Sequence, residues 1–147
     1  MPNIIDTRDL QKRLEELEDE LEVLQEAVND AEEELKECDP DYQEDIDAAH
    51  EAHEEALADL KEWEDENLEE LEELRTLRDE IPEWRHGEAL INDDYFVEYA
   101  QDLAEDLGMD RNQPWPYSCI DWDRAADALK MDYSSCEYQG ETYWYRW

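Results

Sequence analysis

The sequence predicts a mainly helical protein: a long antiparallel coiled-coil helical hairpin over residues 1–81, followed by a small, aromatic-rich α+β domain over residues 82–147 that ends in a β-hairpin. Apolar residues of the first half recur at heptad spacing, which is typical of a coiled coil. No glycine precedes Gly87, and a glycine inside a helix costs about 1 kcal/mol relative to alanine. Thirteen of the 15 aromatic residues lie beyond Pro82, which indicates a separate packed domain there.

The first helix is predicted from a seam whose steps alternate between four and three residues. Asp6 or Thr7 can cap its N-terminus, and the Asp-Pro-Asp sequence at 39–41 ends it, because proline cannot continue a helix. The seam consists of Leu10, Leu14, Leu17, Leu21, Leu24, Val28, Ala31 and Leu35.

The second helix is predicted over about residues 42–80. Its short, proline-containing connection to the first helix favours an antiparallel helical hairpin. Alanines of the two helices would face each other near the turn, so we expect a close approach there. The seam continues through Ile46, Ala49, His53, Ala56, Leu60 and Trp63, and slips in register at Asn67 to Leu68, Leu71, Leu74 and Leu77.

After Pro82 the pattern predicts short elements. A helix over about residues 93–107 ends at Gly108, a normal helix stop. Asp121 caps a second helix, and the C-terminal residues form two strands joined at Gln139-Gly140. About 65 residues is a marginal size for a lone core, so we expect this domain to lean on the base of the hairpin or on a second copy.

Sequence signals for an enzyme are weak. His50, His53 and Glu54 do not have the His-Glu-x-x-His spacing of a zinc hydrolase, and solvated histidines explain them better. No glycine-rich phosphate loop or nucleophile elbow is found. We therefore expect a non-enzymatic protein without a cofactor or a metal.

Composition also bears on location and partners. The sequence contains no run of 18 apolar residues, so no membrane-spanning helix is expected. The N-terminus lacks the pattern of a secretory signal. The three cysteines are widely spaced, which favours reduced thiols. These features predict a cytoplasmic protein. Strong acidity disfavours direct contact with nucleic acid or anionic lipid.

The dominant feature is the net charge of -36, whereas a magnitude of about 2–8 keeps a small domain soluble. Residues 1–80 hold 33 acidic and 7 basic residues. Along arms of roughly 50 Å, their net charge corresponds to about one charge per 2 Å, close to the roughly 1.7 Å per phosphate charge of duplex DNA. Charged coiled-coil faces are usually only solvated surface, but here cation-free stretches such as residues 65–73 repel themselves. The charge therefore favours a surface that imitates a polyanion.

Residues 92–108 and 117–147 resemble the C-terminal part of ArdA-type antirestriction proteins of phages and mobile elements. The resemblance implies a dimeric, non-enzymatic DNA mimic that occupies the DNA-binding groove of restriction-modification enzymes. It covers little more than a third of the chain, and a helical hairpin stands where family members carry further acidic domains. The matching positions are Tyr99, Ala100, Gly108, Asp121, Trp122, Asp123, Ala126, Leu129, Asp132 and Tyr133.

The combined prediction is a phage- or plasmid-borne anti-defence protein of the bacterial cytoplasm. It would bind the basic groove of a host restriction-modification or CRISPR complex, with a homodimer as one arrangement. Two alternatives stay open: an acidic coiled-coil adaptor or scaffold, in which seam residues such as Leu17 and Leu21 would bind partners, and an acidic chaperone of basic nucleic-acid-binding proteins. The predicted partner-binding residues are Glu15, Glu18, Asp19, Glu22, Glu62, Asp65, Glu66, Glu69, Glu70, Glu73, Asp93, Asp94, Glu98, Asp102, Glu105, Asp106, Asp123 and Asp127.

Overall fold

The computed structural model describes residues 3–110 and 112–146 and is mainly helical, with one small antiparallel sheet. The chain divides into two compact units, one formed by Met1–Gln11 with Leu77–Trp147 and the other by Lys12–Thr76. The predicted division is 1–81 and 82–147, whereas the unit that contains the sheet also includes Met1–Gln11. The first residues belong to the unit that contains the sheet, because they supply one of its strands.

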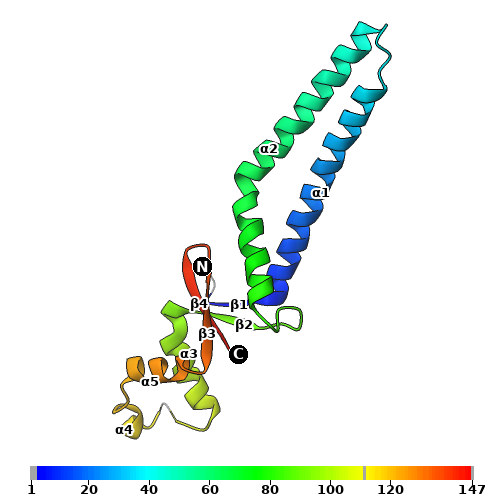
Figure 1. The fold of residues 1–147 in the computed structure, drawn as a ribbon. Coiled ribbons are helices and arrows are strands. Elements are labelled where there is room, and N and C mark those ends of the chain that lie inside the picture. The colour runs from blue at the N-terminus through cyan, green and yellow to red at the C-terminus, as the bar shows by residue number, and fades with distance from the viewer. Residues whose placement is uncertain (1–2, 111, 147) are drawn as a thin grey trace. The chain divides into compact units, whose positions relative to one another are not determined.

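Two long helices run in opposite directions through the unit Lys12–Thr76 (Figure 1). Helix α1 spans Thr7–Glu37 and helix α2 spans Gln43–Glu80, as the sequence predicts. Asp6 caps α1, since its Oδ1 accepts a hydrogen bond of 2.9 Å from the backbone N–H of Arg8. The other predicted cap, Thr7, has a different role, described below.

The seam between α1 and α2 is not equally closed along its length. Leu14, Leu17, Leu71 and Leu74 are at most 1% exposed. Nearer the turn, the facing alanines line a surface pocket of about 320 Å³, while Ala31 and Ala49 are buried. The close approach of the helices there stays a prediction. Coiled-coil packing over the full length stays a prediction. The alanines that line this pocket are Ala27, Ala31, Ala52 and Ala56.

The other unit is built on a four-stranded antiparallel sheet with strand order β1-β2-β4-β3. The predicted C-terminal hairpin is present as β3, Tyr133–Tyr138, and β4, Glu141–Arg146. Its turn residues Gln139 and Gly140 both have positive φ, at 50° and 79°, as a tight hairpin turn requires. Sequence reasoning missed the other two strands, which are β1, Ile4–Asp6, and β2, Ala89–Asn92.

Short helices pack beside this sheet. A 3-10 turn, Asp93–Tyr95, leads into α3, Phe96–Asp106, where a single helix over 93–107 is predicted. The short α4, Pro114–Tyr117, and α5, Trp122–Lys130, follow. Asp121 caps α5 as predicted, by accepting a hydrogen bond from the N–H of Arg124. The core between these helices and the sheet contains Ile91, Phe96, Ala100 and Ala126, with Tyr99, Tyr133 and Trp144 packed against it.

The ends of the two long helices complete the core of the sheet unit. Leu10 at the start of α1 and Leu77 near the end of α2 are both buried, as are Ile81 and Trp84 just beyond. Burial, with Glu80 nearby, raises the pKa of the Cys136 thiol on β3 to about 12. The expectation that this small domain leans on the base of the hairpin or on a second copy stays a prediction.

Thr7 fastens the N-terminal strand into this unit. Its side chain is fully buried, donates a hydrogen bond of 2.9 Å to the carbonyl of Trp84 and accepts one of 2.8 Å from the N–H of Glu88. One hydroxyl therefore satisfies two backbone groups of the segment that leads into β2. A buried backbone group without a partner costs about 1–3 kcal/mol.

We predict that Thr7→Val, which keeps the shape and removes the hydroxyl, lowers the free energy of unfolding by about 2–4 kcal/mol, because two backbone groups lose their partner. Urea denaturation followed by circular dichroism measures this. Thr76 is the matched control, since it is exposed and its hydroxyl bonds only the Glu72 carbonyl of its own helix. Thr76→Val should change stability by less than about 0.5 kcal/mol. Equal effects of the two substitutions would contradict this role of Thr7.

Candidate functional site

The candidate site is the acidic surface of the unit Lys12–Thr76. This unit contains 29 acidic and 5 basic residues. Most of the predicted partner-binding residues here are exposed, and the rest are half-buried. The exposed ones are Glu15, Asp19, Glu22, Glu62, Asp65, Glu66 and Glu69, and the half-buried ones are Glu18, Glu70 and Glu73.

Two of the half-buried carboxylates hold the helices together. Arg13 Nε lies 3.0 Å from Glu70 Oε1, and Arg75 Nε lies 3.3 Å from Glu18 Oε1. The hydrogen bond to Glu70 raises the pKa of Arg13, so this guanidinium stays charged. Glu18 and Glu70 therefore each have an intramolecular cation, and their part in partner binding stays a prediction.

A third cross-helix contact was not foreseen from the sequence. Trp63 is buried, and its indole Nε1–H donates a hydrogen bond of 2.9 Å to Glu20 Oε2. A buried indole N–H usually has an acceptor. The tryptophan in the seam of α2 therefore indicated that a side chain of α1 would accept its indole N–H. The sequence did not identify this acceptor as Glu20.

The exposed acids of α1 form a continuous stripe along one helix face. Successive members are three or four residues apart, so at 1.5 Å per residue the charges follow one another at about 5 Å along the axis. Sequence reasoning included the first members and missed the later ones, although the same spacing identifies them. The stripe is Glu15, Asp19, Glu22, Glu26, Asp30, Glu33 and Glu37, all exposed.

Helix α2 carries a similar stripe. Like charges at these spacings destabilise a helix by about 0.2–0.5 kcal/mol per pair. Helix stability alone therefore does not explain why acidic residues recur at this spacing along both helices. The α2 stripe is Glu44, Asp47, Glu51, Glu55, Asp59, Glu62, Glu66 and Glu69, all exposed.

The predicted acids of the sheet unit divide into structural and exposed groups. Asp93 Oδ1 accepts hydrogen bonds of 2.8 Å from Lys130 Nζ and from Trp144 Nε1, and these contacts lower its pKa. Asp102 is half-buried and accepts a hydrogen bond from the Tyr95 hydroxyl. Asp93 is itself exposed, as are the remaining predicted acids of this unit: Asp94, Glu98, Glu105, Asp106, Asp123 and Asp127.

Four aromatic residues of the segments 92–108 and 117–147 are part of the core. Tyr95, Tyr99, Trp122 and Trp144 are partly buried and pack against the cluster around Phe96. Lys130 Nζ lies 5.3 Å from the centre of the Phe96 ring and 5.1 Å from that of Trp144, within cation–π range. Lys130 therefore ties Asp93 to the aromatic core, and this arrangement is structural.

Comparison with known proteins gives no match: no family model, curated protein or solved structure is similar to this chain. Among the described residues, no helix combines the length and apolar character that crossing a membrane requires. Over the same residues, no group of three or more His, Cys, Asp or Glu side chains is arranged to hold a metal ion.

We predict that Asp93→Asn lowers the free energy of unfolding at pH 7 by about 1 kcal/mol. The effect is small because the Asp93 side chain is 46% exposed, so that solvent screens its ion pair with Lys130. Since folding lowers the pKa of Asp93, its contribution is present above the ordinary aspartate value of about 4 and disappears as the pH falls through the folded-state value. Urea denaturation of both proteins at neutral and acidic pH measures this.

The neighbouring Asp94 is the control, because its side chain is exposed. Asp94→Asn should leave the stability nearly unchanged at both pH values. A difference between wild type and Asp93→Asn that stays constant down to acidic pH would contradict the assignment of the effect to the Asp93 charge.

Proposed function

We propose that this chain is an anti-defence protein that acts as a DNA mimic. It binds the basic DNA-binding groove of a host restriction-modification or CRISPR complex and excludes DNA, with carboxylates in place of phosphates. The single observation that carries the proposal is the pair of exposed acidic stripes on α1 and α2, in a unit with 29 acidic and 5 basic residues.

Helix geometry supports this proposal. At 1.5 Å per residue, the 31 residues of α1 and the 38 of α2 span about 46 and 57 Å. The net charge of -24 on Lys12–Thr76 then amounts to about one charge per 2 Å, near the roughly 1.7 Å per charge of duplex DNA. We further propose that α1 and α2 form an antiparallel coiled-coil hairpin, whose width of two helices is similar to that of a duplex.

A fixed array of charges suits competition with DNA. Electrostatic attraction between this surface and a basic channel should steer the encounter, which makes association fast and strongly dependent on salt. Because the carboxylates are attached to helices, their spacing is set before binding. DNA would have to displace a ligand of similar charge density that needs no reordering.

The proposal predicts that the purified protein displaces labelled DNA from a type I restriction enzyme or from a CRISPR surveillance complex. Electrophoretic mobility shift and fluorescence anisotropy measure the displacement, with salt titrated in parallel. Displacement should weaken as salt rises. DNA binding that stays unchanged across both kinds of complex would overturn the proposal.

Neutralised variants locate the surface. Replacing every acid in residues 15–22 and 65–73 by its amide should abolish inhibition while helicity by far-UV circular dichroism is kept. A smaller set, Glu15→Gln, Asp19→Asn and Glu22→Gln, should weaken binding about tenfold or more. The matched control changes the net charge equally at exposed acids of the other unit: Glu83→Gln, Asp132→Asn and Glu137→Gln. Equal losses in both sets would show that only total charge matters.

The second candidate function is an acidic adaptor, and two exposed apolar side chains favour it. Val23 on α1 is 64% exposed and Leu57 on α2 is 43% exposed. Leu17, one of the seam residues expected to bind partners in that case, is fully buried and is not available. An adaptor would lose its partner on Val23→Ser with Leu57→Ser and keep it after the acidic stripe is neutralised, the opposite of a DNA mimic.

A further inference from the structure

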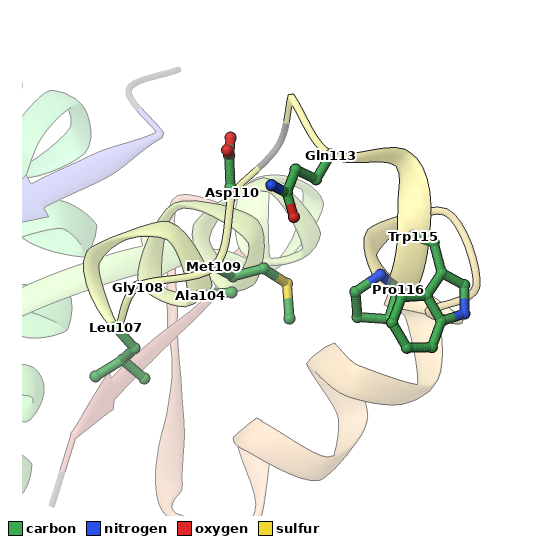
Figure 2. Close-up of a pocket in the computed structure, with 8 residues that line it drawn as sticks. All are labelled: Ala104, Leu107, Gly108, Met109, Asp110, Gln113, Trp115 and Pro116. Carbon is green, nitrogen blue, oxygen red and sulfur yellow. The ribbon is translucent and has the colours of Figure 1, made fainter.

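A pocket opens in the sheet unit at the end of α3, away from its aromatic core. Its volume is about 490 Å³, within the range of about 300–1,000 Å³ that is typical of ligand sites. The lining is largely apolar and includes Leu107, Met109, Trp115 and Pro116. In Figure 2 the end of α3 forms one side and the Trp115-Pro116 segment the other, with the Met109 side chain extending toward Pro116.

The α3 side of the pocket is fixed by the way the helix ends. Gly108 has a φ of +107°, and its N–H donates to the carbonyl of Glu105, while the N–H of Met109 donates to that of Ala104. This pattern is a Schellman motif, in which a hydrophobic contact often accompanies the left-handed residue. Ala104 and Met109, the residues that such a contact joins, both line the pocket. This wall is therefore held by backbone hydrogen bonds.

On the way to the other side, residues 110, 112 and 113 are joined by hydrogen bonds. Asp110 Oδ1 accepts a hydrogen bond of 2.8 Å from the N–H of Asn112, and its carbonyl accepts one of 3.2 Å from Gln113. Trp115 has extended dihedral angles, φ -110° and ψ 136°, inside the short α4. Trp115 is 74% exposed, and Leu107, on the α3 side of the pocket, is 81% exposed.

Exposed aromatic and aliphatic side chains beside a pocket are typical of protein interfaces, where tryptophan often supplies much of the binding energy. Among the described residues, Trp115 and Leu107 are two of the seven large hydrophobic side chains that are markedly exposed. Neither belongs to the acidic stripes of α1 and α2. The acidic surface therefore does not account for them.

The charge around the pocket limits its occupant. Glu105, Asp106 and Asp110 are exposed beside it, and the whole chain carries -36. An anionic membrane surface is repelled by this charge, and a second copy of the chain carries the same charge to the interface. A polypeptide segment with a large apolar side chain between lysines or arginines complements both the apolar lining and the acidic rim.

We propose that this pocket binds such a basic-apolar segment of the partner protein and serves as the anchor that makes binding specific. The proposal rests on the proposed function for the identity of the partner, a protein with a basic groove. The acidic stripes attract any basic surface. The pocket adds a contact that only a partner with a segment of matching shape can make. DNA, the competing ligand of that partner, has no apolar pocket and cannot bind the segment in this way.

The test uses the full-length protein and two labelled peptides of equal charge. One has a single phenylalanine between lysines, and the other has alanine at that position. We expect the phenylalanine peptide to bind about tenfold more tightly, and this ratio should persist at high salt, where the stripes are screened. Fluorescence anisotropy measures both affinities at low and high NaCl.

Variants locate the contact. Trp115→Ala and Leu107→Ala should each reduce the ratio of the two affinities toward one. Both side chains are exposed, so the melting temperature should hardly change. Met131→Ala is the matched control, because Met131 is 86% exposed and does not line the pocket, and it should leave the ratio intact. Equal affinity of the two peptides, or a ratio unaffected by Trp115→Ala, would overturn the proposal.

Two further measurements separate other occupants. Binding to phosphatidylglycerol vesicles that is lost in Trp115→Ala would replace the peptide segment by a membrane. A wild-type dimer that Trp115→Ala converts to a monomer in analytical ultracentrifugation would replace it by a second copy. Either result overturns the proposal. A peptide ratio that depends on Trp115, beside unchanged DNA binding by all tested defence complexes, would keep the pocket and reject the proposed function.

Discussion

Like-charge repulsion is the constraint on which the helical unit depends. Lys12–Thr76 carries a net charge of -24, which opposes the approach of two acidic helices. The opposing contacts are concentrated at one end of the pair. Four leucines, Leu14, Leu17, Leu71 and Leu74, are buried there, and the pairs Arg13–Glu70 and Glu18–Arg75 lie in the same stretch. Toward the turn the buried seam residues are small, such as Ala31 and Ala49. They bury less apolar area than leucine, so burial offsets less of the repulsion there.

This distribution places the contacts that stabilise the unit between the helices and the acidic stripes on their exposed faces. The few cations near the buried leucines neutralise carboxylates that face the other helix. The outer faces keep their stripes, because three of the five basic residues of Lys12–Thr76 lie at positions 12, 13 and 75, close to its two ends in sequence. A sequence selected for stability alone would alternate Glu with Lys at these spacings. This chain lacks such alternation of Glu and Lys along its stripes. The interpretation that these positions are selected for negative charge, and not for helix stability, is therefore favoured.

Long periodic segments were predictable, and short or non-local features were not. The leucine seam and the sequence around Pro40 fixed both helices to within a few residues, and Gly108 and Asp121 marked helix ends correctly. Strands β1 and β2 have three and four residues, too few for alternation to appear, and their pairing joins residues more than 80 positions apart. The ion pairs of Glu18 and Glu70 depend on which arginine lies opposite each of them. The register of the two helices decides this, and counting charges in the sequence does not give the register.

An imitator of DNA faces a problem that charge cannot solve. Its target already binds a polyanion of similar density, present in large excess in the cell, and salt screens both interactions alike. Carboxylates arranged like phosphates can at best equal the competitor. Additional free energy must come from contacts that DNA lacks, and apolar side chains seated in a pocket supply such contacts with little dependence on salt. Under the proposed function, an apolar pocket beside acidic residues therefore supplies the contact that an acidic surface alone lacks.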